Sequence, residues 1–214
     1  MIRRFNQWSL TFLFMCASVS LASQCPDTGE TKVVKPFKGS GFYFYRLIGI
    51  HSFQYFLDGK EFSSNSKDNS DHTYTFIDKM AFEVVLVNKA AFKKYIKKDT
   101  PQGILEAHAK YGQAYFKEIL KKTKITNLGH YWRPDKKGNP ERLFLFWKKD
   151  SPSKSGVATQ YLLSTMLDND VVVALSIIPL IGCTEADVFQ QAKNYTGHFD
   201  LLTAEQCSHL PQAP

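Results

Sequence analysis

The chain has 214 residues, of which 43% are apolar, and it carries a formal net charge of +7. This apolar content is ordinary for a globular protein, the length suits one domain with its own core, and no segment after the N-terminus approaches the roughly 20 apolar residues of a membrane-spanning helix. The modest basic excess favours anionic surfaces, although a solubilising surface charge explains it as well.

The N-terminal segment predicts a secretory signal peptide over residues 1–22. Arg3 and Arg4 precede a short uncharged apolar run, and Ser20-Leu21-Ala22 places small residues at the two positions that a signal peptidase reads. We therefore expect cleavage near Ala22 and a secreted or periplasmic protein. An uncleaved membrane anchor and a lipoprotein attached at Cys25 are the alternatives.

The mature chain is expected to begin with a flexible polar leader over 23–40, followed by a single domain over 41–210. Within the domain, the aromatic block 41–56 fits neither the strand nor the helix period. Residues 73–77 and 81–87 are rich in β-branched and apolar side chains, which predicts two strands.

The clearest helix begins at Pro101. Thr100 is a good N-cap, and a proline at the first helical position loses no hydrogen bond. Apolar residues then recur on one face as far as Ile119. His108 belongs to that face, where we expect a hydrogen-bonded core or boundary residue.

Four further strands and a last helix complete the expected order. Strands over 129–132 and 142–148 flank a turn, and strands over 158–166 and 171–178 are joined by a tight turn at 167–170. In 142–148 both alternating sets of side chains are apolar, so both faces of this strand should be covered. Thr184 with Asp187 predicts a capping box at the start of the last helix.

This order predicts an α+β fold with a central, mostly antiparallel sheet and helices packed on it, an α/β/α sandwich-like arrangement. Over residues 70–200 the order resembles the superfamily of the photosystem extrinsic protein PsbP and the bacterial envelope protein DcrB. The resemblance implies a small, usually non-enzymatic domain that binds a protein partner or serves as an accessory or chaperone-like factor. It carries no motif, and therefore no functional residue.

Three cysteines remain after the predicted cleavage, namely Cys25, Cys183 and Cys207. An odd number outside the cytoplasm indicates one disulfide and a leftover thiol, or pairing between molecules. A bridge between Cys183 and Cys207 would pin the C-terminal tail, so we expect this disulfide, although Cys25 could pair with either. A catalytic Cys183 is the alternative, and it would need a lowered thiol pKa.

No catalytic, metal or phosphate-binding motif is present. The six histidines show no metal-ligand spacing, and G-x-S-x-G, Walker and G-x-G-x-x-G patterns are missing from the sequence. We therefore expect no enzymatic activity, no metal site and no cofactor. Glu83 and Glu106 could pair as acid and base, but Glu106 more simply complements a helix N-terminus.

Two surface features could bind partners. Tyr131, Trp132 and Arg133 lie in a basic, aromatic hairpin over 130–142 and are the candidate contact with a protein partner; a solvated hairpin with Trp132 folded onto the core is the alternative. A lysine cluster over 93–98 could touch an anionic membrane surface, although a solvated face is the simpler explanation. No nucleic acid is expected as a partner.

The leading hypothesis is a non-enzymatic accessory or interaction protein of the cell envelope, which acts through contacts with a protein partner of unknown identity. The alternatives are an envelope hydrolase with a dispersed active site and a binder of an anionic ligand or membrane surface. A deep pocket lined by two or more titratable groups would favour the enzyme. A flat or grooved apolar patch around Trp132 would favour the partner binder.

Overall fold

The computed structural model describes residues 31–48, 51–64, 74–119, 123–153 and 156–210. The predicted signal peptide and Cys25 lie outside these residues. No helix among the described residues is both long enough and apolar enough to cross a membrane.

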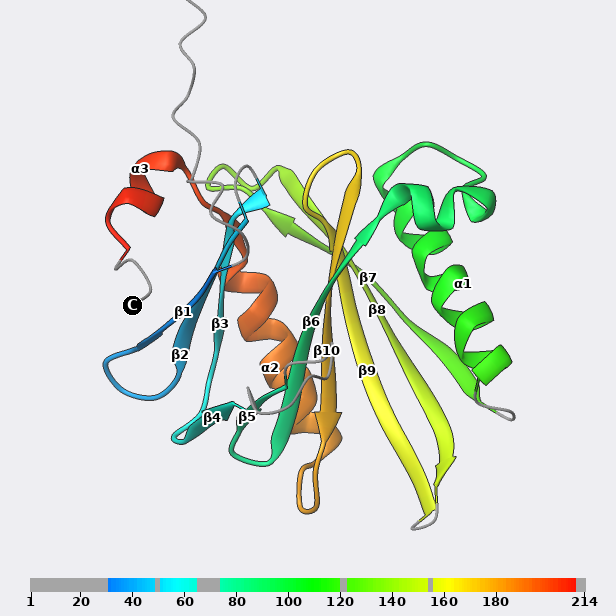
Figure 1. Ribbon diagram of the computed structural model, residues 1–214, viewed down its shortest axis with the longest axis horizontal. Coiled ribbons are helices and arrows are strands. Elements are labelled where there is room, and N and C mark those ends of the chain that lie inside the picture. The colour runs from blue at the N-terminus through cyan, green and yellow to red at the C-terminus, as the bar shows by residue number, and fades with distance from the viewer. Residues whose placement is uncertain (1–30, 49–50, 65–73, 120–122, 154–155, 211–214) are drawn as a thin grey trace, which may run out of the picture.

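A seven-stranded antiparallel sheet forms the centre of the molecule (Figure 1). Its strands, in spatial order, are β4 (Phe62–Ser64), β5 (Thr75–Ile77), β6 (Met80–Asn88), β10 (Val171–Pro179), β9 (Gly156–Met166), β8 (Pro140–Ser153) and β7 (Lys124–Pro134). The predicted hairpins are confirmed, because β7 pairs with β8 and β9 pairs with β10 in antiparallel register. This large sheet carries packed side chains on both of its faces.

A second sheet of four strands lies apart from the first. It contains β1 (Thr31–Pro36), β2 (Phe42–Leu47), β3 (Phe53–Leu57) and β11 (Asp200–Leu201). The aromatic block 41–56, for which neither period fitted, therefore supplies a pair of antiparallel strands, β2 and most of β3.

The predicted flexible leader over 23–40 is wrong for residues 31–36. These residues form β1, which pairs with β2 along its whole length. Val34 also packs against the main core. Backbone pairing and this apolar contact explain why the segment is ordered despite its polar neighbours.

The helices lie on opposite faces of the large sheet (Figure 1). The short 3-10 helix η2 (Lys89–Tyr95) and α1 (Pro101–Ile119) pack on one face, whereas α2 (Glu185–His198) packs on the other. A one-turn helix, α3 (Ala204–Ser208), follows near the C-terminus. The predicted helix starts are confirmed: the Thr100 hydroxyl accepts the Gly103 N–H at 3.2 Å, and Thr184 and Asp187 form the capping box of α2.

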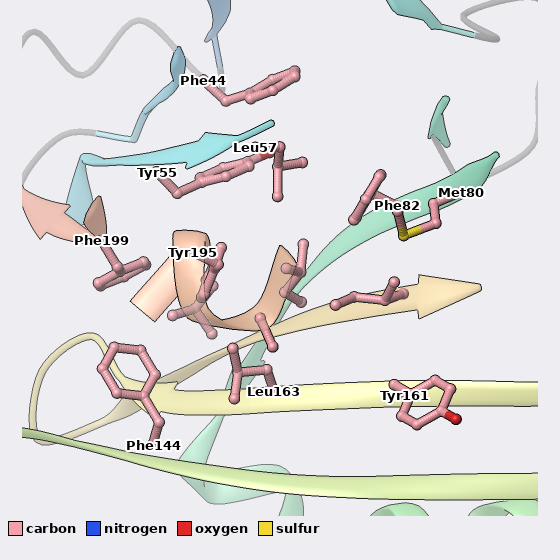
Figure 2. Packing of buried hydrophobic residues seen from close by; sticks show 14 of the residues in the cluster. Phe44, Tyr55, Leu57, Met80, Phe82, Phe144, Tyr161, Leu163, Tyr195 and Phe199 are labelled. Atoms are coloured by element: carbon pink, nitrogen blue, oxygen red, sulfur yellow. The ribbon is translucent and has the colours of Figure 1, made fainter. Parts of the chain in front are cut away.

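The main core lies around α2, between the two sheets (Figure 2). Tyr195 of α2 contacts Tyr55 of β3 at a ring-centroid distance of 5.3 Å and Phe144 of β8 at 6.4 Å. The α+β class is confirmed. The sandwich-like arrangement is not confirmed, because a second sheet, which the prediction did not include, packs against α2.

The predicted alternation in β8 is also confirmed. Phe144 and Phe146 belong to the core around α2, whereas Leu143, Leu145 and Trp147 belong to a second core beneath α1. Because successive side chains of a strand point to opposite faces, β8 contributes to both cores at once. The core beneath α1 is the one that borders the candidate site.

Candidate functional site

A cleft of about 590 Å³ lies between α1 and the large sheet. Its volume is within the range of roughly 300–1,000 Å³ that is typical of small-molecule sites. Helix α1 contributes one wall and strands β6, β10, β9 and β8 contribute the other. Among the lining residues, Val85 and Tyr115 are exposed, which places an opening of the cleft beside them.

The two halves of α1 meet the sheet differently. The first half packs closely, with Leu105 and Ala107 almost fully buried, whereas no residue of described burial after Ala109 is buried. Gly112 makes the close contact in the second half, because a Cβ at this position would lie 3.2 Å from Cη2 of Trp147. Helix α1 therefore packs against the Trp147 indole at Gly112, and both residues line the cleft.

Four polar residues meet on the sheet side of the cleft. The Gln160 side chain donates to the Ser176 hydroxyl at 2.5 Å. Strand register places Glu83 opposite Ser176, and Lys149 opposite Gln160. Burial lowers the pKa of Lys149, and the negative charge of Glu83 opposes this shift.

Two buried nitrogens in the lining have no hydrogen-bond partner among the described residues, Nε1 of Trp147 and Nδ1 of His108. Trp147 is only 2% exposed. A buried polar group without a partner is costly, on the order of 1–3 kcal/mol. The indole N–H is therefore a donor that the described residues leave unused.

His108 is a core residue, as predicted, at 5% exposure. Its ring meets that of Phe92 edge-on at 5.5 Å. Burial lowers the pKa of His108 to about 4, so the imidazole is neutral near pH 7. The expected hydrogen bond is not made at Nδ1 by any described residue.

The predicted disulfide between Cys183 and Cys207 is wrong. Cys183 is a free thiol, whereas Cys207 is disulfide-bonded. The alternative pairing of Cys25 with Cys207 stays a prediction, because Cys25 lies outside the described residues. The physical reason is placement: the Cys183 side chain turns to the start of α2, where its Sγ contacts the Thr184 carbonyl at 3.5 Å.

The alternative of a catalytic Cys183 is not supported. Burial raises the pKa of its thiol, Asp187 raises it further, and Lys79 opposes the shift. A reactive cysteine needs the opposite shift. The other candidate pair is not brought together either, because Glu83 and Glu106 line different cavities and Glu106 lies 3.8 Å from His130.

The three hairpin residues have different surroundings. Tyr131 and Trp132 are 49% and 47% exposed, on the edge strand β7. The Arg133 side chain is only 11% exposed, donates to the carbonyls of Phe199 and Thr196, and pairs with Asp200 at 3.1 Å. A partner contact thus remains a prediction for the two aromatic residues, while Arg133 ties β7 to the end of α2.

The sequence did not predict the cleft, because its lining residues come from separate elements; of these, Glu83 and His108 were considered only singly. One signal was present: Gln160, Ser176 and Lys149 each place a polar side chain in a strand that is otherwise largely apolar at inward positions. Lys149 extends the inward series of Leu143, Leu145 and Trp147. Within the described residues, no group of three or more His, Cys, Asp or Glu side chains could hold a metal ion.

No protein-family model matches the chain, and no curated protein matches it. Among solved structures, the chain is similar to cyanobacterial PsbP (CyanoP) from Synechocystis sp. PCC 6803. The match has a TM-score of 0.47 and 8% sequence identity, and covers 89% of this chain and 99% of that chain. No residue role, partner or activity of that protein is transferred to this chain.

Proposed function

We propose that this chain is a secreted or periplasmic, non-enzymatic accessory protein of the cell envelope that acts by binding, with the cleft beneath α1 as its main binding site. The predicted signal peptide supports the location. The observation that carries the binding role is the cleft itself: about 590 Å³, with aromatic side chains in its lining and an unpartnered indole N–H. A largely apolar cavity with a few polar groups is typical of small-molecule sites.

The cleft contains titratable groups, yet the surroundings of His108 and Ser176 favour binding over hydrolysis. His108 has a pKa of about 4, which makes it a weak base near pH 7. The Ser176 hydroxyl is buried and already engaged by Gln160. An activated nucleophile would need a base within hydrogen-bond reach, and no described hydrogen bond joins Ser176 to one.

Binding in the cleft can be tested with N-phenyl-1-naphthylamine, an uncharged probe that fluoresces in apolar surroundings. We expect the wild-type protein to bind it with one site per chain. Val85→Phe enlarges an exposed side chain that lines the cleft and should weaken binding at least tenfold. Leu201→Phe is the matched control, because Leu201 is also an exposed strand residue but lies outside the cleft.

Equal binding by the wild type and Val85→Phe would reject the cleft as the site. A steady turnover of ester or glycoside substrates that Val85→Phe abolishes would instead favour the enzyme. Thermal unfolding of each variant establishes that the fold is retained.

A contact with a protein partner at Tyr131 and Trp132 is the second candidate, supported by the half-exposed state of both rings. Crosslinking in envelope extract, followed by pull-down, should recover a partner with the wild type and lose it with Trp132→Ala. Phe189→Ala is the matched control, because Phe189 is a comparably exposed aromatic residue on α2. Recovery of the same partners by Trp132→Ala would reject the contact.

A further inference from the structure

Lys149 is a buried lysine whose ammonium is close enough to Glu83 to be affected by its charge, but forms no ion pair with it. The residue is 8% exposed, and its Nζ lies 3.7 Å from the ring centroid of Phe116 on α1. No hydrogen bond or ion pair to this ammonium occurs among the described residues. A cation–π contact compensates only part of the cost of removing an ammonium from water, so an anion in the cleft would be strongly stabilised.

A second donor lies on the same face of β8. Trp147 precedes Lys149 by two positions in β8, so both side chains are on the face of the sheet that lines the cleft. The indole N–H and the ammonium are both hydrogen-bond donors, and neither group can accept a hydrogen bond. A carboxylate has two acceptor oxygens, which suits two neighbouring donors of this kind.

Glu83 is the other charged side chain among the described lining residues. It has interactions of its own in the protein, and its charge counteracts the lowering of the Lys149 pKa. His108 is neutral near pH 7 because burial lowers its pKa to about 4, and burial together with Glu83 raises the pKa of the Tyr74 phenol. The cleft therefore contains one buried cation that interacts with Glu83 only at a distance, and an anionic ligand could contact that cation directly.

The rest of the lining is suited to an apolar body. Phe116, Tyr111 and Tyr115 extend along α1, and Val85 and Val87 face them from β6. We infer that the cleft binds a monocarboxylic acid with an apolar tail, its carboxylate at Lys149 Nζ and Trp147 Nε1 and its tail between α1 and β6. This inference rests on the proposed function and adds the chemical class and orientation of the ligand.

The test compares three ten-carbon amphiphiles that differ only in the head group: decanoate, decanol and decylamine. Each is titrated against the protein carrying N-phenyl-1-naphthylamine, and displacement of the probe gives its affinity. Wild-type protein should prefer decanoate over decanol by about tenfold or more, as expected for a charge-assisted hydrogen bond. Lys149→Met should remove this preference while leaving decanol binding within about threefold.

Lys148→Met is the matched control. It removes the same charge from the adjacent residue, whose side chain points to the other face of the sheet and pairs with Glu185 at 3.3 Å. This variant should keep the preference for decanoate. Trp147→Phe retains an aromatic ring without the N–H, and should reduce decanoate affinity several-fold more than decanol affinity.

The outcomes separate the two proposals. Equal affinity for decanoate and decanol, or tighter binding of decylamine, overturns the inference about the ligand. The proposed binding function of the cleft is still supported in that case if Val85→Phe weakens binding of the probe. Failure of the wild type to bind the probe overturns both. If Lys149→Met does not fold, Trp147→Phe decides, and an unchanged ratio of decanoate to decanol affinity in that variant overturns the assignment.

Discussion

At the scale of single residues, His108 links burial to pH. Its pKa is about 4 in the folded protein, because burial disfavours the imidazolium, and about 6.5 in an unfolded chain. Below pH 6.5 the unfolded chain therefore binds a proton that the folded protein does not bind. The stability that neutral, buried His108 contributes is therefore fully present above pH 6.5. It is lost as the pH falls from 6.5 toward the folded-state pKa of about 4.

We predict that His108→Gln reduces the loss of stability in acid. Between pH 7 and pH 4.5 the wild type should lose about 2–3 kcal/mol more of its free energy of unfolding than the variant, since one pKa unit corresponds to about 1.4 kcal/mol. Urea unfolding of both proteins at the two pH values measures this difference. Identical losses would contradict the assignment of a neutral, buried His108.

A second residue-scale prediction concerns the cysteines. Alkylation of the denatured, unreduced protein should modify Cys183, and should modify Cys207 only after reduction. Because Cys16 belongs to the predicted signal peptide, we expect peptide mapping to find Cys207 joined to Cys25. A peptide that joins Cys183 to Cys207 would contradict this pattern.

At the scale of secondary-structure elements, Arg133 connects β7 to the end of α2. The guanidinium donates to the Phe199 carbonyl and pairs with Asp200 and Glu141, each at 3.1 Å. We predict that Arg133→Met lowers the free energy of unfolding by about 2–4 kcal/mol, since it removes charge-assisted bonds from a largely buried site.

The control for this substitution is Lys136→Met, a loss of charge at an exposed position of the same hairpin. It should change stability by less than about 0.5 kcal/mol. Denaturant titration of both variants makes the comparison. Equal losses of unfolding free energy in the two variants would contradict a specific stabilising role for the bonds of Arg133.

Elements defined by local signals were predictable from the sequence. The start of α1 follows from Thr100-Pro101, and the capping box of α2 follows from Thr184 and Asp187. Strand β11 was missed because it has two residues, and only its long-range pairing with β3 defines it. The cleft was missed for the same reason, since its polar groups come from strands that the fold brings together.

At the scale of the whole molecule, Tyr195 of α2 lies between the two sheets. Its ring is fully buried, contacts Tyr55 of the smaller sheet and Phe144 of the larger one, and lies 5.4 Å from Phe199. Burial raises the pKa of Tyr195 well above its usual value. The hydroxyl has no hydrogen-bond partner among the described residues.

We predict that two substitutions of Tyr195 change the free energy of unfolding differently. Tyr195→Ala leaves a cavity between the sheets and should cost about 3–5 kcal/mol, whereas Tyr195→Phe removes a buried hydroxyl without a partner and should be neutral or stabilising by about 1 kcal/mol. Thermal and denaturant unfolding measure both. A clearly destabilised Tyr195→Phe would contradict the absence of a hydrogen bond at this hydroxyl.

The glycine on which α1 rests has a consequence for ligand selectivity. A methyl group at position 112 would lie 3.2 Å from the indole of Trp147, so the helix would have to move outward by a few tenths of an ångström. Gly112 thus sets the spacing between helix and sheet without supplying any polar contact. Substitution by alanine or serine offers a way to engineer the tail length or thickness that the protein accepts, while the groups that would bind the carboxylate stay in place.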